Sequence, residues 1–120
     1  MVEKSPSLQK KQKKRLGNEN VQWFDSINDL KGMEGCIFSN ELPDAFPVHA
    51  VVMEKELMEV FVGYENNFIE VLKPASTQLE DYFKELDIRL PSGYRTEVNL
   101  DMIKWIREIS SALKKGFVIT

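Results

Sequence analysis

The sequence predicts an α/β fold in which a mostly parallel sheet, flanked by helices, carries an inserted antiparallel β meander. Two patterns predict this combination. Residues 2–39 alternate between short β-rich runs and helical segments, which is the order that builds a parallel sheet. Residues 50–72 hold three apolar runs separated by short polar stretches, which is the spacing of antiparallel strands joined by turns.

The first half of the chain is divided by clear helix signals. Ser5 and Pro6 are suited to the N-cap and first position of a helix whose buried face carries residues 8, 12 and 16. Gly17 and Asn18 are expected to end it. The expected elements are, in order, the end of a strand at residues 2–3, a helix over 6–16, a strand at 21–24, a short helix capped by Ser26 over 27–30, and a strand at 36–38.

The second half contains the meander and two amphipathic helices. Thr77 and Glu80 have the spacing of a capping box, and Asn99 is placed to cap the most amphipathic helix of the chain, which is expected to end at Lys114 and Lys115. The expected elements are strands at 50–53, 57–62 and 68–72, a helix over 77–86, a strand at 94–98, a helix from residue 99, and a strand at 117–120.

The outermost elements of the chain are strands. We therefore expect the 120 residues to be one partial domain. Residues 1–49 and 99–120 would form its α/β sheet and helices, and residues 50–98 the inserted meander with its helix.

The composition is that of an ordinary globular protein, with 42% hydrophobic and 29% charged residues. A single cysteine excludes an internal disulfide framework and a cysteine-rich zinc site. Cys36 stands in an apolar run, so we expect a buried, unreactive thiol. No run has the length of a membrane span and the first residues lack a signal-peptide pattern, so a cytoplasmic protein without membrane contact is expected.

The charge is spread unevenly along the chain. The net charge is −3, but residues 1–15 carry six cations and one anion, a net +5, which leaves −8 on the remainder. This basic helix is either a solvated face or a surface for nucleic acid or an acidic protein. No aromatic or glycine-rich element alternates with its lysines to stack a base, so nucleic-acid binding is not expected.

Polar residues follow three of the predicted strands. In an open parallel sheet, ligands bind beyond the carboxyl ends of the strands, so these residues are the candidate site. Glu3 is suited to accept hydrogen bonds from two ribose hydroxyls, although an exposed glutamate without function fits equally well. Asp25 and Ser26 could bind an adenine amino group or only cap the next helix. The three groups are Glu3 with Ser5, Asp25 with Ser26, and Asn40 and Glu41 with Asp44.

The third group is the densest. Residues 40–47 hold an amide, two carboxylates and two prolines, which lower the entropic cost of ordering the side chains between them. Asn40 could accept a hydrogen bond from a substrate nitrogen, and Glu41 or Asp44 could hold a cation or accept a proton. The alternative is a rigid loop whose acids cap turns. His49 is the single histidine, so we expect no metal site and a structural role for it, with proton transfer as the alternative.

Four segments of the chain resemble the MidA-like family of S-adenosyl-L-methionine-dependent methyltransferases, which includes an arginine methyltransferase of mitochondrial complex I assembly. The most specific is the Asn-Glu-Leu-x-Asp-Ala-x-Pro-Val-His pattern that ends at His49. The resemblance implies a class I, Rossmann-like sheet, S-adenosyl-L-methionine as cofactor, and a protein arginine as substrate. Within the match, Pro43 stands where many members carry another residue, and we expect it to stiffen the loop. The matching segments are residues 2–8 with Gln9, Arg15 and Leu16, residues 37–49, residues 94–100 with Trp105 and Ile106, and residues 116–120.

The resemblance also implies residue roles. Glu3 would hold the cofactor ribose, and Glu41 would neutralise or orient a guanidinium. The implied cofactor-binding residues are Glu3, Ser5, Asp25 and Ser26. The implied catalytic residues are Asn40, Glu41 and Asp44.

The family's first strand and glycine-rich cofactor loop are not found in the 120 residues. We therefore expect the isolated chain to bind the cofactor weakly or not at all, to be inactive, and to favour homo-oligomers through an exposed sheet edge. The alternative function is a non-catalytic module that binds a protein or nucleic acid through the basic helix.

Overall fold

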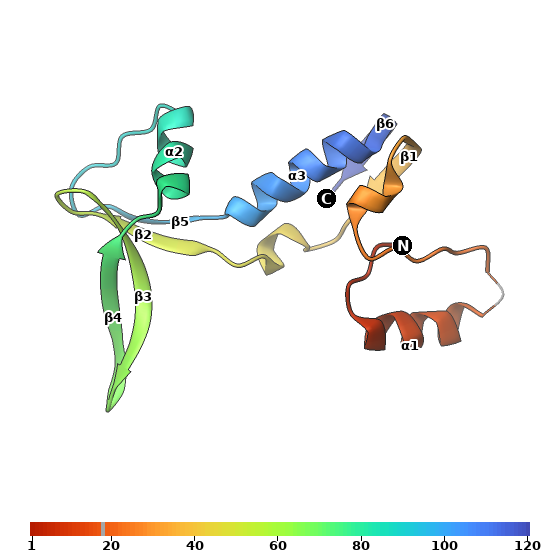
Figure 1. The fold of residues 1–120 in the computed structure, drawn as a ribbon, viewed down its shortest axis with the longest axis horizontal. Helices are drawn as coiled ribbons and strands as arrows, with labels where there is room; N and C mark the ends of the chain where they lie inside the picture. Colours follow the sequence, from red (N-terminus) through yellow and green to blue (C-terminus); the bar gives the residue numbers. More distant parts are fainter. Residues whose placement is uncertain (18) are drawn as a thin grey trace. The chain divides into compact units, whose positions relative to one another are not determined.

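The described strands form a two-stranded parallel sheet and a four-stranded antiparallel sheet (Figure 1). The computed structural model describes residues 1–17 and 19–120. Residues Met1–Pro43 and Lys104–Thr120 make up one unit, which contains the parallel sheet, and Asp44–Ile103 make up a second, which contains the antiparallel sheet. The predicted α/β class, with a parallel sheet and an antiparallel meander, is confirmed.

The parallel sheet pairs β1 (Met33–Phe38) with β6 (Leu113–Ile119). Gly35 lies opposite Gly116, and a Cβ added to Gly116 would be 1.7 Å from the Gly35 carbonyl oxygen, so the two backbones approach this closely only because residue 116 is glycine. Cys36 of β1 is exposed, so the expectation of a buried thiol is wrong. The reason is that this sheet has only two described strands, so little of the described chain covers the Cys36 side chain.

The two predicted strands nearest the start of the chain are reduced to one parallel bridge between Val2 and Phe24. The Phe24 amide donates to the Met1 carbonyl at 2.9 Å, and the Glu3 amide donates to the Phe24 carbonyl at 3.0 Å. These two bonds are too few to form a regular strand, but they place residues 3 and 25 side by side at the same strand exit.

Helix α1 (Pro6–Leu16) begins and ends where its capping residues predict. The Ser5 Oγ accepts a hydrogen bond from the Leu8 amide at 3.4 Å, and Gly17 follows the helix with a φ of 53°. Asn18 lies outside the described residues. The expected apolar buried face is wrong, because no residue of α1 is buried and Leu8 is 45% exposed. The short helix is confirmed as the 3₁₀ helix η1 (Ile27–Leu30), with Ser26 as its N-cap.

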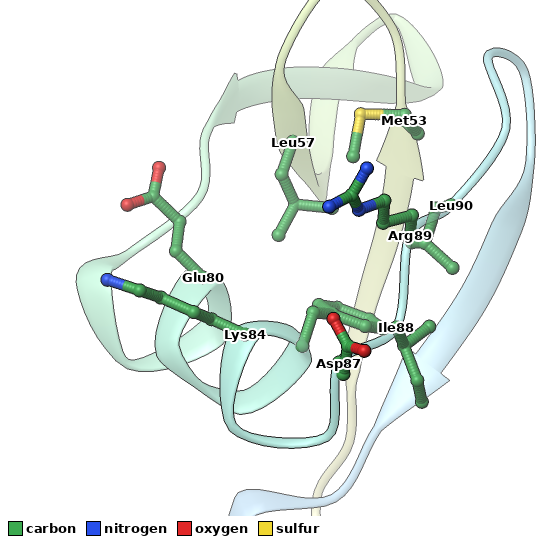
Figure 2. Close-up of a pocket in the computed structure, with 9 residues that line it drawn as sticks. Met53, Leu57, Glu80, Lys84, Asp87, Ile88, Arg89 and Leu90 are labelled. Carbon is green, nitrogen blue, oxygen red and sulfur yellow. The ribbon is translucent and has the colours of Figure 1, made fainter.

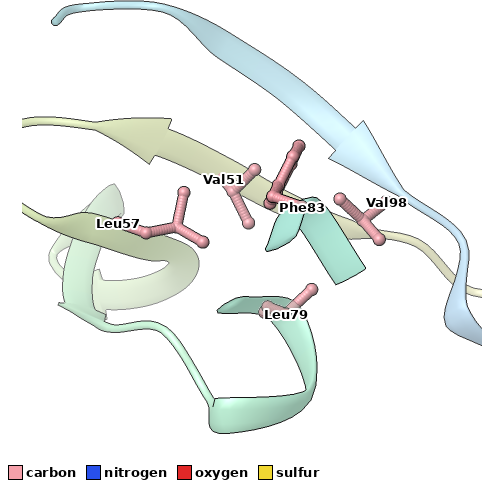
Figure 3. Packing of buried hydrophobic residues seen from close by; sticks show 5 residues of the cluster. All are labelled: Val51, Leu57, Leu79, Phe83 and Val98. Atoms are coloured by element: carbon pink, nitrogen blue, oxygen red, sulfur yellow. The ribbon is translucent and has the colours of Figure 1, made fainter. Parts of the chain in front are cut away.

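The antiparallel sheet has the strand order β4-β3-β2-β5. Helix α2 (Thr77–Glu85) covers one face of it, and Leu79, which is 0% exposed, packs at the centre of the resulting core. Figure 3 shows this core, which consists of Val51, Leu57, Leu79, Phe83 and Val98. The strands are β2 (His49–Met53), β3 (Leu57–Glu65), β4 (Asn67–Pro74) and β5 (Arg95–Val98).

One expected capping interaction and one expected helix end are wrong. The N-cap of α2 is Ser76 and makes no side-chain cap bond, so the capping box expected from Thr77 does not form. Helix α3 (Leu100–Ala112) starts as predicted, since the Asn99 Oδ1 accepts from the Met102 amide at 2.8 Å, but it stops before Lys114. The reason is that β6 begins at once and its backbone bonds to β1. Among the helices of residues 1–17 and 19–120, none is long and apolar enough to span a bilayer.

Candidate active site

The Glu3 carboxylate is held by two donors, one from the N-cap of α1 and one from the second half of the helix. Its Oε1 accepts from the Ser5 amide at 2.8 Å, and its Oε2 accepts from the Gln12 Nε2 at 3.3 Å. Glu3 is half-buried, and an ionised carboxylate offers about four acceptor positions, so acceptor capacity remains for a ligand. The side chain is thus fixed where the chain leaves its bridge to Phe24.

Gln9 connects Glu3 with the second strand exit. Its Nε2 donates to the Glu3 carbonyl at 2.6 Å and to the Asp25 Oδ1 at 2.7 Å. The Ser26 Oγ instead accepts from the Asn28 amide at 3.2 Å, which is the capping role. The structure therefore brings Glu3 and Asp25 into one network and gives Ser26 a structural bond. Binding of a cofactor by these residues stays a prediction.

Two glutamines of this network were not singled out as site residues from the sequence. Gln12 accepts from the Trp23 Nε1 at 2.9 Å while it donates to Glu3, so its amide bridges the two residues. Gln9 and Gln12 are three residues apart on α1, which puts both on the side of the helix that faces the strand exits. The sequence signal that could have identified Gln9 and Gln12 is two amide side chains three residues apart on the helix that follows Glu3.

The third strand exit is tied to the end of the parallel sheet. The Ser39 amide donates to the Ile119 carbonyl at 2.9 Å, and its Oγ donates to the Thr120 Oγ1 at 2.7 Å. Asn40 and Glu41 follow directly and are exposed, and neither side chain has a hydrogen bond or ion pair in the described part of the chain. Both are therefore available to a ligand at the carboxyl end of β1.

Glu41 has an unusual backbone conformation, with a φ of 48°. A non-glycine residue in this left-handed region costs on the order of 1–3 kcal/mol, and such residues concentrate at functional sites. Asp44 lies in the 3₁₀ helix η2 (Pro43–Ala45), where the proline restricts the first position as expected. The Asp44 side chain is exposed and, within residues 1–17 and 19–120, also makes no hydrogen bond or ion pair. Catalytic roles for Asn40, Glu41 and Asp44 stay predictions.

An exposed ion pair joins β5 and β4 in the second unit. The Arg95 Nη2 and the Glu70 Oε1 are 2.7 Å apart. The hydrogen bond from Arg95 holds the pKa of Glu70 below its usual value, and the same bond raises the pKa of Arg95. In the part of the chain that the structure covers, no three His, Cys, Asp or Glu side chains are grouped so that they could hold a metal ion.

A cavity of about 420 Å³ lies in the second unit, beside α2 (Figure 2). Apolar side chains, among them Met53 and Leu57, and charged side chains, among them Lys84 and Arg89, line it together (Figure 2). None of the predicted site residues lines it. The lining residues are Met53, Leu57, Glu80, Phe83, Lys84, Asp87, Ile88, Arg89 and Leu90.

A second cavity, of about 530 Å³, lies in the first unit between the two pieces of parallel strand. Val2 and Phe24 line it from the bridge, and Cys36, Ile37 and Phe38 line it from β1. Its lining is mixed, with the polar residues Asn20 and Gln22 beside the apolar side chains.

A protein-family model with the description "Putative S-adenosyl-L-methionine-dependent methyltransferase" matches residues 1–120. The chain belongs to this methyltransferase family. The expected family is therefore confirmed over the whole chain. A comparison with curated proteins gives no match.

Two crystal structures from Burkholderia thailandensis share the fold of this methyltransferase-family chain. An uncharacterized COG1565 superfamily protein matches with a TM-score of 0.72 and 24% identity over 94% of this chain and 32% of its own. A COG1565 superfamily member bound to S-adenosyl-homocysteine matches with a TM-score of 0.69 and 24% identity over 94% of this chain and 31% of its own. The chain thus spans about a third of the length of either structure.

Proposed function

We propose that the chain is part of a cytoplasmic, Rossmann-like methyltransferase that transfers a methyl group from S-adenosyl-L-methionine to arginine side chains of proteins. The observation that carries the proposal is the half-buried Glu3 carboxylate, which Ser5 and Gln12 hold at a parallel-strand exit beside Asp25. A carboxylate fixed in this way is suited to the two hydroxyls of a ribose. The family match and the S-adenosyl-homocysteine in one structural relative support the identity of the cofactor.

The residues of the third exit suit a cationic substrate. Bound S-adenosyl-L-methionine supplies an electrophilic methyl group on a sulfonium. Glu41 and Asp44 would hold a guanidinium by charge-assisted hydrogen bonds, and the Asn40 carbonyl would accept from one of its N–H groups. All three side chains are exposed and unpaired in the described residues, so no internal bond has to break first. Their task is to orient the nitrogen for in-line displacement, which supplies most of the rate in such a transfer.

We also propose that the isolated chain is inactive because its parallel sheet is incomplete. The open cavity between Val2 and β1 lies beside the free edge of β1, where an additional strand could pair. Phe38 on its wall is 71% exposed, which supports an apolar occupant. A second copy of the chain that covers the same open edge would form the homo-oligomer expected from the sequence.

The test is a methyl-transfer assay with radiolabelled S-adenosyl-L-methionine and an arginine-containing protein. The chain is assayed alone and as part of a protein that supplies the remaining two-thirds of the family fold. Label should appear on arginine only in the second case. Glu41→Gln should reduce the rate, and Glu54→Gln, in the exposed turn between β2 and β3, is the matched control. Label on another residue type would refute the proposal that arginine is the substrate. Methyl transfer by the chain alone would refute the proposal that the incomplete sheet makes it inactive.

A second candidate is an interaction module that uses the basic helix. Lys10, Lys11, Lys14 and Arg15 are exposed, and none of them has an ion pair in the described part of the chain. This candidate predicts RNA or DNA binding that weakens with salt and is lost when the lysines are changed to glutamine. Absence of RNA and DNA binding at low salt would exclude a nucleic-acid-binding function for this helix.

A further inference from the structure

His49 and Glu59 meet on the sheet face that carries the core of the second unit. Val51 pairs with Glu59 in the register of β2 and β3, and side chains alternate between faces along a strand. His49, two residues before Val51, therefore lies on the same face and diagonal to Glu59. The His49 Nδ1 and the Glu59 Oε1 are 2.6 Å apart, which is a short hydrogen bond.

The two side chains differ in their exposure. Glu59 has only 14% of its side chain exposed, whereas His49 has 41%. Lys73 is directly opposite Glu59 on β4, but its Nζ lies over the Phe61 ring, 4.9 Å from the centroid. Within residues 1–17 and 19–120, the Glu59 carboxylate therefore has His49 as its single hydrogen-bond or ion-pair partner. A carboxylate so far removed from water depends on this one contact for its stabilisation.

The contact determines which nitrogen of His49 carries the proton. An ionised carboxylate can only accept a hydrogen bond, so the Nδ1 must be the donor. In neutral imidazole the Nε2 then keeps its lone pair, and this atom makes no hydrogen bond in the described part of the chain. Histidines that accept protons in enzymes are oriented in the same way, by a carboxylate that binds the Nδ1 hydrogen.

We propose that the His49 Nε2 is the proton acceptor for an N–H-bearing cationic substrate and that Glu59 is its positioning residue. The use of this pair in catalysis rests on the proposed methyl transfer to arginine. Asp44, one of the residues proposed to hold the guanidinium, precedes His49 by five residues in the same unit.

The proton balance of the transfer requires that the substrate nitrogen give up one proton. As the N–C bond forms, the C–S bond breaks and its electron pair stays on sulfur, which becomes a neutral thioether. The methylated guanidinium keeps a single positive charge only if its nitrogen loses one proton. That proton goes to the His49 Nε2, and the half-exposed imidazole then releases it to water.

The first test is the tautomer of His49, measured by ¹⁵N NMR on the chain itself. His49 is the single histidine, so its signals need no assignment. The proton should be on Nδ1, and Glu59→Gln should reduce the population of this tautomer. Glu70→Gln, the same substitution on β4 of the same sheet, should leave it unchanged. A proton on Nε2 in the unmodified chain would overturn the proposal.

The second test measures methyl transfer in the protein that contains the chain together with the rest of the fold. His49→Gln should lower kcat by about 10²–10⁴-fold with KM unchanged. Glu59→Gln should lower kcat less, and Glu59→Asp should recover part of the loss. An active protein in which His49→Gln keeps its kcat would refute the catalytic role. If the unmodified protein methylates no arginine, the proposed function fails, and the tautomer still decides whether the acceptor site exists.

Discussion

Leu79→Ala tests the packing that holds α2 against the strands carrying His49 and Glu59. Leu79 is 0% exposed and contacts the cluster formed with Val51 and Phe83, so truncation removes apolar contacts and leaves a cavity that a small core cannot fill. Such truncations cost about 2–5 kcal/mol, and full burial puts the expected loss in unfolding free energy near 3 kcal/mol. Because about 1.4 kcal/mol is a factor of ten, the backbone amides of β2 should exchange with solvent roughly 100-fold faster.

The assay is amide hydrogen exchange followed by NMR, with urea unfolding as an independent measure of the free energy. Leu86→Ala is the matched control, because Leu86 is the residue after α2 and is 52% exposed. Surface substitutions of this kind usually change the free energy of unfolding by about 0.5 kcal/mol or less. Equal losses for Leu79→Ala and Leu86→Ala would refute the assignment of this core.

Three further predictions test separate features. Ser5→Ala removes the cap of α1 and should cost about 1 kcal/mol, measured as lost helicity by circular dichroism and an earlier urea transition; an unchanged transition would contradict the cap. Gly116→Ala should lower the melting temperature far more than Gly93→Ala, because both positions have positive φ but only Gly116 faces a backbone atom that a Cβ would overlap. Glu70 has its pKa lowered below 4.5 by Arg95, so the pair contributes stability above pH 4.5 and loses it as the pH falls through the folded-state pKa. Glu70→Gln should therefore remove part of the acid dependence of the melting temperature, and an identical acid profile would contradict this.

The elements that could be predicted are those defined by local chemistry. Ser5, Pro6 and Gly17 mark the ends of α1, and the apolar runs that begin at Ala50, Leu57 and Phe68 mark the meander, because capping bonds and side-chain alternation act over a few residues. The end of α3 could not be predicted, because its boundary with β6 is decided by pairing with β1, which is distant in sequence. The exposure of Cys36 likewise depends on how many strands and helices cover β1.

The carboxylates of the candidate site could be predicted from the sequence, but the residues that hold them in place could not. Glu3 and Asp25 were identified by their place after strands, and the structure links them. The link is Gln9, whose amide bridges two strand exits only after α1 has folded back. The partner of His49 is Glu59 on a neighbouring strand, and only the register of β2 and β3 brings the two together.

A calorimetric titration of the 120-residue chain with S-adenosyl-homocysteine measures how much of the proposed cofactor site the chain supplies by itself. We proposed that Glu3 and Asp25 form one part of a cofactor site in a larger fold. The chain alone should therefore show no measurable binding, and in a protein with the complete fold Glu3→Gln should weaken binding. Micromolar binding by the chain alone would contradict this proposal.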